Sequence, residues 1–221
     1  MTAPDTGTEP TPTPTPTKGA RTRRALLHAA IRRFAHDGFR ATSMVEIARD
    51  ANLSGTATYV YFPNKEALFI AAVDEDASGV VHAGLGLLVD ARKSQAWHEL
   101  LPTLLDSLDH HPLARRVLGG LEPEFTVRLL DIPVLAEMRK ASADLLRIQQ
   151  LAGEVRSDID PDRMASGLMT IVLSMLMSLI QTGLDPSEPL VADVHTVFDA
   201  ALHPPSVSAR PPKPRRAPDR G

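Results

Sequence analysis

The segment from Thr42 to Glu66 constrains the fold more than any other part of the chain, because it predicts two short helices joined by a tight turn. Ser43 is followed three residues later by Glu46, which is the spacing of a capping box. We therefore expect a helix to begin directly after Ser43. Asn52 is expected to take the left-handed conformation that stops this helix.

The second helix of the segment, expected at about residues 55–61, has an unusual composition. It begins Gly-Thr-Ala-Thr, a run of low intrinsic helix propensity, and Ser54 precedes it as the expected N-cap. Small side chains let a backbone approach a surface closely, and hydroxyl groups can bond phosphates and base edges of DNA. A tight packing contact inside the protein would explain the same residues, because helix-turn-helix shapes also occur without DNA.

The sequence on either side of this segment helps to decide between DNA binding and an internal packing contact. An amphipathic helix is expected upstream, over residues 24–39, with Leu27, Ile31 and Phe34 on one face and Gly38 at its end. Another helix start follows residue 63. Two helices and a turn are thus enclosed between two longer helices.

Residues 21–69 together resemble the amino-terminal domain of the TetR family of transcriptional regulators. The matching residues are in register without a gap and are Ala29, Ala30, Phe34, Gly38, Phe39, Thr42, Ser43, Ile47, Ala48, Ala51, Ser54, Tyr59, Tyr61, Phe62, Lys65, Glu66, Ala67 and Leu68. The chain departs from the family at Asn52-Leu53, Gly55, Thr56 and Val60. These departures concern the operator sequence rather than the fold, since Gly55 offers no side chain to a base.

The resemblance implies a DNA-reading surface made by the turn and its neighbours. The bases are assigned to Val45, Thr56 and Thr58, with Gly55 and Ala57 allowing close approach. The phosphates are assigned to Thr42, Ser43, Ser54, Tyr59, Tyr61 and Lys65. A basic arm ahead of the first helix, with Lys18, Arg21, Arg23 and Arg24, could follow the DNA backbone or be a solvated helix start.

Charge is unevenly distributed along the chain. The 221 residues carry a net charge of −3 at pH 7, but residues 18–65 carry a net +6 and residues 66–203 a net −11. A basic head followed by an acidic body concentrates the attraction for phosphate in one region. The segregation favours DNA binding over an evenly solvated surface.

The two ends differ from the rest in composition. Residues 1–17 form a Thr-Pro run without an apolar core, and residues 204–221 are Pro-rich and basic, so both are expected to be disordered. We expect a DNA-binding domain over residues 18–66 and a ligand-binding and dimerisation domain over residues 67–203. With no cysteine and no signal peptide, a cytoplasmic protein is expected.

The body predicts an all-α fold, because no segment shows a convincing alternation typical of strands. A first helix is expected over residues 64–90, with candidate breaks near Gly79, Gly84 and Gly86. Further helices are expected at 96–110, 113–120, 123–130, 133–153, 161–181 and 189–202. Asp160 and Pro161 mark the start of the helix 161–181, and Gly183 marks its end.

Residues 164–180 of that helix carry no charge. A membrane span is disfavoured because the run falls short of the roughly 20 residues that a bilayer needs and hydroxyl residues interrupt it. The TetR resemblance implies that the last two helices form a four-helix bundle with a second subunit. The implied contacts are Met169, Leu173, Leu176, Met177, Ile180, Val194, Val197 and Phe198, for which burial in the subunit's own core is the alternative.

The resemblance also implies an apolar effector cavity within residues 64–153. The candidates are Trp97, His98, Leu101, Leu104, Leu105, Phe125, Arg128, Leu129, Met138 and Leu145, with ordinary core positions as the alternative. His110-His111 does not support a metal site, because adjacent helical residues face different directions. We expect no metal and no cofactor.

Two other functional classes were compared with a DNA-binding regulator. An enzyme is disfavoured because GLGLL near Gly84 is only a fragment of a dinucleotide-binding motif, in a helical context. A protein-interaction module using the Pro-rich ends is the other alternative. We expect a homodimeric TetR-type repressor, released from a palindromic operator in double-stranded DNA by a small hydrophobic ligand.

Overall fold

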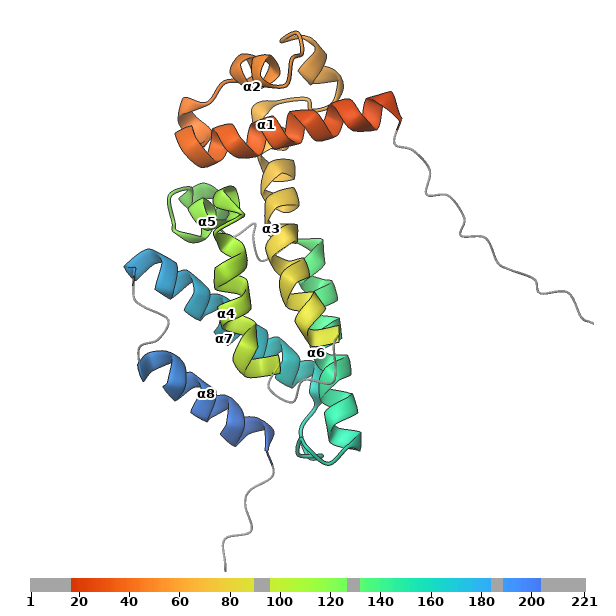
Figure 1. Ribbon diagram of the computed structural model, residues 1–221, viewed down its shortest axis with the longest axis vertical. Helices are drawn as coiled ribbons and strands as arrows, with labels where there is room; N and C mark the ends of the chain where they lie inside the picture. The colour runs from red at the N-terminus through yellow and green to blue at the C-terminus, as the bar shows by residue number, and fades with distance from the viewer. Residues whose placement is uncertain (1–16, 90–95, 127–131, 184–188, 204–221) are drawn as a thin grey trace, which may run out of the picture. The chain divides into compact units, whose positions relative to one another are not determined.

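The computed structural model describes residues 17–89, 96–126, 132–183 and 189–203, which are helical with connecting turns (Figure 1). The prediction of an all-α fold is confirmed, since the described residues contain no strand. The elements are α1 (Lys18–Ala41), α2 (Met44–Asp50), the 3₁₀ helix η1 (Ala57–Val60), α3 (Lys65–Val89), α4 (Ala96–Leu108), α5 (Pro112–Leu118), α6 (Pro133–Leu151), α7 (Pro161–Thr182) and α8 (Pro189–Leu202).

The chain divides into two compact units, one up to Ala77 and one from Ser78 onward. The division falls inside α3, so this helix contributes to both units. The predicted domain boundary after residue 66 lies two residues into α3, which passes through it without interruption. Glycines 79, 84 and 86 do not break α3, contrary to the candidate breaks.

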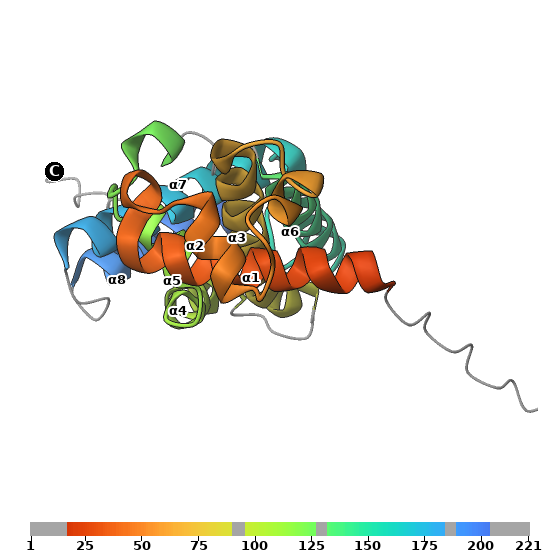
Figure 2. The ribbon, with the colours of Figure 1, turned by 90° about the horizontal axis from the view of Figure 1, so that it is seen from above.

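The first unit has an aromatic core. Within this unit α2 packs against α1 (Figure 2). The rings of Phe34 and Phe69 meet edge to face with centroids 4.9 Å apart, and Phe39 meets Phe69 in the same way at 5.1 Å. Such aromatic pairs add about 1 kcal/mol each beyond the burial of their surface. The cluster joins the end of α1 to the first turns of α3.

Local sequence signals in the first unit give the expected local structure. Ser43 and Glu46 form the predicted capping box at the start of α2. Asn52, which follows α2, has the expected positive φ of 56°. Gly38 has a φ of 82° and interrupts the helical backbone at a kink inside α1, whose last turn continues to Ala41. The first helix is longer than predicted, because Thr17 caps it by accepting a hydrogen bond from the amide of Ala20.

The second unit contains α4 to α8 and the second half of α3. Its closest helix pair is α6 and α7, and α7 also packs against α4 and α5 (Figure 1). Asp160 caps α7 by accepting from the amides of Asp162 and Arg163, and Gly183 ends it with a φ of 68°. Both ends of α7 are therefore as predicted.

Some predictions for the body need qualification. Residues 123–126 form a short 3₁₀ turn rather than the start of an α-helix, and residues 127–130 of the expected helix lie outside the described residues. The predicted tail, and the arm apart from Thr17, lie outside them as well.

Helix α7 is long and apolar enough to cross a membrane by length and composition, and it is the one helix of the described residues that meets this test. In the second unit, only 33% of its most apolar window is buried. Three of its exposed hydroxyls bond back into the helix, since Thr170 donates to the carbonyl of Ser166, Ser174 to that of Thr170 and Thr182 to that of Ser178. An apolar helix with one uncovered side calls for a partner.

Candidate DNA-binding surface

The element expected to read DNA is shorter than predicted. Only the 3₁₀ helix η1 forms where an α-helix over residues 55–61 was expected, and Ser54 makes no N-cap hydrogen bond to a backbone amide. Its hydroxyl lies 3.3 Å from that of Thr56 instead. The low helix propensity of Gly-Thr-Ala-Thr accounts for the short element, because little local energy favours a longer helix.

Thr58 is not available to a base, which corrects its predicted role. Its side chain is 0% exposed, and its hydroxyl donates to the carbonyl of Gly55 at 2.7 Å. Tyr61 is half-buried and keeps part of its surface. In a 3₁₀ helix, residues three apart are eclipsed. Thr58 lies on the side of η1 that faces the interior, which explains why its predicted contact with a base is wrong.

The exposed face of this region is apolar apart from a few hydroxyls. Val60 is 81% exposed, Val45 is 57% exposed, and Tyr59 and Thr56 are exposed as well. A β-carbon on Gly55 would lie 3.7 Å from a methyl of Val45, which places this residue of α2 beside the turn. Ala57 is half-buried next to them.

Val60 is the residue that the sequence analysis missed. It was noted only as a departure from the aromatic residue common in the family. Val60 directly follows Tyr59, a predicted DNA contact, and this was the available indication that Val60 is exposed. In a regular α-helix, however, two adjacent residues are not both expected to point outward. In the short η1 turn both are exposed.

The two hydroxyl residues ahead of α2 are already engaged. Thr42 is buried and donates to the carbonyl of Gly38 at 2.8 Å, so its assignment to a phosphate is corrected. The exposed Ser43 donates to Glu46 Oε2 at 2.8 Å. The hydroxyl and amide of Ser43 lower the pKa of the Glu46 carboxyl. These bonds fix the start of α2 and hence the position of Val45.

Lys65 has an internal role that the sequence did not predict. Its ammonium donates to the carbonyls of Phe39 at 2.8 Å and Thr42 at 3.0 Å, and lies 4.5 Å from the centre of the Phe39 ring. A third carbonyl, of Arg40, lies at 3.5 Å. The lysine therefore satisfies carbonyl groups at the end of α1, where intrahelical partners are missing. An ammonium held in this way cannot also clamp a phosphate.

A forked ion pair braces the two helices of the first unit. Arg33 of α1 donates from Nε to Asp50 Oδ2 at 2.5 Å and from Nη2 to Oδ1 at 3.1 Å. Hydrogen bonding by this guanidinium lowers the pKa of the Asp50 carboxyl. Two parallel bonds fix an angle as well as a distance, so α2 is held in register on α1.

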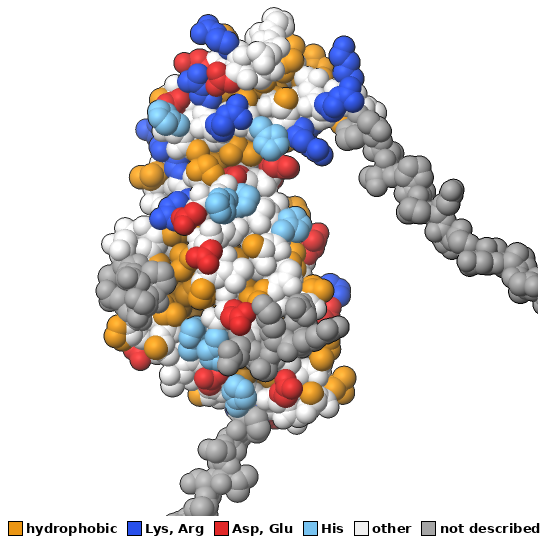
Figure 3. Space-filling model, in the orientation of Figure 1, with side chains coloured by type: hydrophobic (Ala, Val, Ile, Leu, Met, Phe, Trp, Pro, Cys, Tyr) orange, Lys and Arg blue, Asp and Glu red, His pale blue; other side chains and the backbone are white. Residues whose placement is uncertain are grey.

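Basic side chains gather on the first unit, as seen on the face shown in Figure 3. Arg21 and Arg23 of the predicted arm are exposed on the first turns of α1. The Arg23 guanidinium lies 5.0 Å from the centre of the Phe62 ring, a cation–π distance. The arm is thus helical, and Arg23 connects it to the residues after η1.

Comparisons with known proteins agree with this geometry. Residues 26–72 match the family described as "Bacterial regulatory proteins, tetR family". The chain belongs to the TetR family. It is a DNA-binding transcriptional regulator and not an enzyme.

Relatives of similar length support membership over most of the chain. The chain is 25% identical over 193 residues to the HTH-type transcriptional regulator YdgC of Bacillus subtilis, covering 80% of this chain and 90% of the relative. It is 27% identical over 172 residues to the HTH-type transcriptional repressor Rv1474c of Mycobacterium tuberculosis, covering 76% and 86%.

Solved structures show that the fold is shared. A TetR-family transcriptional regulator from Mesorhizobium loti has a TM-score of 0.65 at 23% identity, covering 86% of this chain and all of that one. FadR of Thermus thermophilus, a TetR-family repressor solved in complex with lauroyl-CoA, has a TM-score of 0.59 at 20% identity, covering 85% and 99%. The two-part helical architecture is therefore that of the family.

Most of the predicted effector residues of this TetR-family regulator that the structure describes are buried in the second unit. Trp97, Leu101, Leu104, Phe125, Met138 and Leu145 are buried, and His98 and Leu105 are half-buried. A space of about 10 Å³ lies beside Trp97 and Leu101, which is room for about one water molecule. Arg128 and Leu129 lie outside the described residues. The larger pocket described below involves only Trp97 and His98 of this set.

The predicted dimer residues fall into two groups. Met169, Leu176 and Phe198 are buried inside the second unit, which corrects their assignment to an interface. On α7, Met169 and Leu176 continue the inward stripe of Ala165, Leu168 and Val172, as helical spacing requires. The second group keeps exposed surface and consists of Leu173, Met177, Ile180, Val194 and Val197.

Ile171 should be added to the second group. It is 38% exposed on α7, and Val197 is 58% exposed on α8. Sequence periodicity could not identify it, because apolar residues occupy nearly every side of α7. Only the packing of α4, α5 and α6 on one side of α7 shows which residues remain uncovered.

Proposed function

We propose that this TetR-family regulator is a homodimeric repressor that binds a palindromic operator in the cytoplasm and is released by a small hydrophobic ligand. DNA binding by a transcriptional regulator is the established part. The dimer, the operator symmetry and the effector are the proposal, and each rests on a separate observation.

The observation that supports operator reading is the small exposed face formed by Val45, Thr56, Tyr59 and Val60. Apolar side chains in a major groove distinguish bases through the thymine methyl group, and hydroxyls bond base edges or phosphates. Exposed arginines on the same unit provide attraction to phosphate, including Arg21 and Arg23. We propose that the operator positions facing Val45 and Val60 are A·T pairs.

The uncovered side of α7 supports a dimer. Along its middle, Ile171 is apolar and the hydroxyls of Thr170 and Ser174 are already bonded within the helix, so contact of these residues with another protein surface costs few lost hydrogen bonds with water. A second copy of the same helix gives a two-fold interface. Two reading heads related by that axis would meet half-sites about one DNA turn, roughly 34 Å, apart.

The effector is proposed by analogy with the ligand of a structural neighbour, since Thermus thermophilus FadR was solved with lauroyl-CoA. The interior between α4 and α6 in this chain is apolar, with Leu104, Met138 and Leu145 buried there. Gly84 of α3 leaves space that the ends of Met138 and Leu104 fill. A ligand that binds better to a conformation unfit for DNA lowers operator affinity by its difference in affinity.

The test begins with selection of operator DNA from a randomised pool, followed by anisotropy titrations with Val45→Glu. Val45 is exposed, so the variant should fold normally, but its carboxylate should repel the DNA. We expect operator affinity to fall by at least about tenfold. Replacing the facing thymines by uracil, which removes only the methyl group, should weaken the original protein and leave Val45→Ala nearly unaffected.

Leu121→Glu is the matched control, because it also places a charge on an exposed apolar residue, but in the second unit. It should retain full affinity. Equal losses in both variants would show a general charge effect and reject the assigned surface. Addition of lauroyl-CoA to the operator complex tests release separately, and no release would remove the acyl-CoA analogy without affecting the DNA surface.

A further inference from the structure

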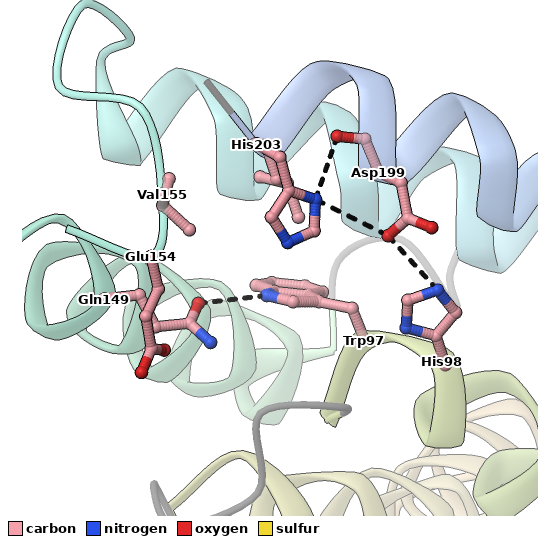
Figure 4. Close-up of a pocket in the computed structure, with 8 residues that line it drawn as sticks. Trp97, His98, Gln149, Glu154, Val155, Asp199 and His203 are labelled. Carbon is pink, nitrogen blue, oxygen red and sulfur yellow. Dashed lines mark hydrogen bonds and ion pairs between the residues drawn. The ribbon is translucent and has the colours of Figure 1, made fainter. Parts of the chain in front are cut away.

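A pocket of about 320 Å³ lies in the second unit, lined by residues of α4, the end of α6, the turn after α6, and the end of α8 (Figure 4). Its residues include Trp97, Gln149, Glu154, Asp199 and His203. The volume is at the lower end of the range for small-molecule sites. Glu154 and His203 are exposed, so the pocket is open to solvent.

An aromatic surface forms one wall. Trp97 is 4% exposed and donates its indole N–H to Gln149 Oε1 at 3.4 Å, so the part of it that borders the pocket is a small area of the ring (Figure 4). Gln149 is buried, so this bond also fixes the ring against α6. The face of an indole ring is the aromatic surface that attracts cations most strongly.

Acidic groups form other parts of the pocket. Asp199 Oδ1 lies 3.3 Å from His98 Nε2, which positions this carboxylate, while His203 Nδ1 lies 3.0 Å from the backbone carbonyl of Asp199 and 3.7 Å from its Oδ1 (Figure 4). The Glu154 carboxylate has no hydrogen-bond or ion-pair partner among the described residues. The residues that line the pocket thus include two carboxylates and no lysine or arginine.

The surrounding charge has the same sign. Residues 66–203 carry a net −11, which raises the local concentration of cations and lowers that of anions. A carboxylate without a partner, a fixed second carboxylate and an indole face are complementary to an ammonium group attached to an apolar body. An anion would meet no lysine or arginine among the residues that line the pocket.

We propose that this pocket binds a small organic cation, of the class of primary amines carrying an aromatic or aliphatic body. The ammonium group would pair with the exposed Glu154 carboxylate, with the apolar body directed into the pocket toward Trp97. The site is distinct from the apolar interior proposed for the effector, and the proposal concerns binding alone. It therefore stands or fails independently of the repressor function.

The chain contains one tryptophan, so fluorescence excited in the tryptophan band reports this pocket directly. The full chain is titrated with phenethylamine at mildly alkaline pH, and in parallel with 2-phenylethanol, its neutral counterpart, and 3-phenylpropionate, an anion of similar size. We expect a saturable change with the amine and a dissociation constant about tenfold higher for the alcohol. The carboxylate compound should give no saturable change.

Glu154→Gln should raise the dissociation constant for the amine several-fold, because it removes one carboxylate from an exposed position that needs no partner to fold. Glu137→Gln is the matched control, since Glu137 is an exposed carboxylate of α6 outside the pocket lining. Asp199→Asn gives a second measurement, although it also loosens the contact of α8 with His98. Equal binding of amine and alcohol, or equal effects of the Glu154 and Glu137 variants, would overturn the proposal.

Discussion

The two units of the molecule expose apolar side chains in different settings. In the first unit, Val45, Tyr59 and Val60 are exposed on short elements among basic residues. In the second, Ile171 and Val197 are exposed on long helices within an acidic part of the chain. The same observation therefore indicates two kinds of partner, because the surrounding charge attracts DNA in one case and opposes it in the other.

The units also differ in how their polar groups are used. In the first unit, Thr42 and Lys65 donate to backbone carbonyls, and Ser43 donates to the Glu46 carboxylate. In the second unit, the hydroxyls of Thr170 and Ser174 on α7 are exposed but bonded within their own helix. The first unit thus has the properties of a rigid DNA-reading surface, and α7 has those of an adaptable contact surface. The substitutions described next test whether the side chains of the two units have these different roles.

The largest effect is expected from charges placed on opposite sides of α7. Leu176→Glu buries a carboxylate in the second unit and should cost about 4 kcal/mol of unfolding free energy, measured by denaturant titration. Ile171→Glu should fold normally, because its position keeps exposed surface, but should dissociate the proposed dimer in light scattering. A Val197→Glu variant should act like Ile171→Glu.

This prediction depends on the contrast between Leu176 and Ile171. If Leu176→Glu folds with full stability while Ile171→Glu unfolds, the inner and outer faces of α7 have been assigned wrongly. A folded and fully dimeric Ile171→Glu, together with a dimeric Val197→Glu, would place the interface on other helices.

A smaller effect is expected from Lys65→Ala in the first unit. Loss of the hydrogen bonds to the carbonyls of Phe39 and Thr42 should lower the unfolding free energy by about 2 kcal/mol and speed hydrogen exchange at the end of α1. Lys18→Ala removes an exposed charge from the same unit and should leave stability unchanged.

DNA binding distinguishes the two roles considered for this lysine. A positioning residue should lower operator affinity without changing the slope of affinity against salt concentration. A phosphate clamp would leave stability intact and reduce that slope by about one phosphate contact. The second result would contradict the internal role of Lys65.

The smallest effect is expected from two glycines of α3. A β-carbon at Gly79 would lie 2.0 Å from His111 Cε1, so Gly79→Ala should destabilise the second unit by about 1–2 kcal/mol. A β-carbon at Gly86 meets nothing within 4 Å, so Gly86→Ala should add up to about 1 kcal/mol through helix propensity. Thermal unfolding of both variants measures the difference, and equal shifts would mean that His111 moves away without cost.

Sequence reasoning succeeded where a residue and its partner lie close along the chain. The capping box of Ser43 and Glu46, the cap at Asp160 and the left-handed Asn52 all depend on bonds or angles within a few residues. It failed at η1, where a weak propensity was extended into an α-helix. The wrong assignment of the buried Thr58 to a base followed from that error.

For the candidate site, residue types indicated the region but not the role of each side chain. Val45 and Tyr59 are exposed where a reading surface needs them, whereas Thr42 is buried. Family resemblance assigns positions, but it does not show which groups the rest of the unit already uses. Lys65 was therefore given to a phosphate although its ammonium is held by the end of α1.

The sequence by itself determined the helical fold, the ends of α2 and α7, and the separation of basic and acidic parts, because these depend on local propensity and on composition. The tertiary structure decided which side of α7 is uncovered, where the ammonium of Lys65 lies, and that Trp97, Glu154 and Asp199 line one pocket. These contacts join residues more than 20 positions apart. No local energy specifies them, so only the packing of the whole unit brings their partners together.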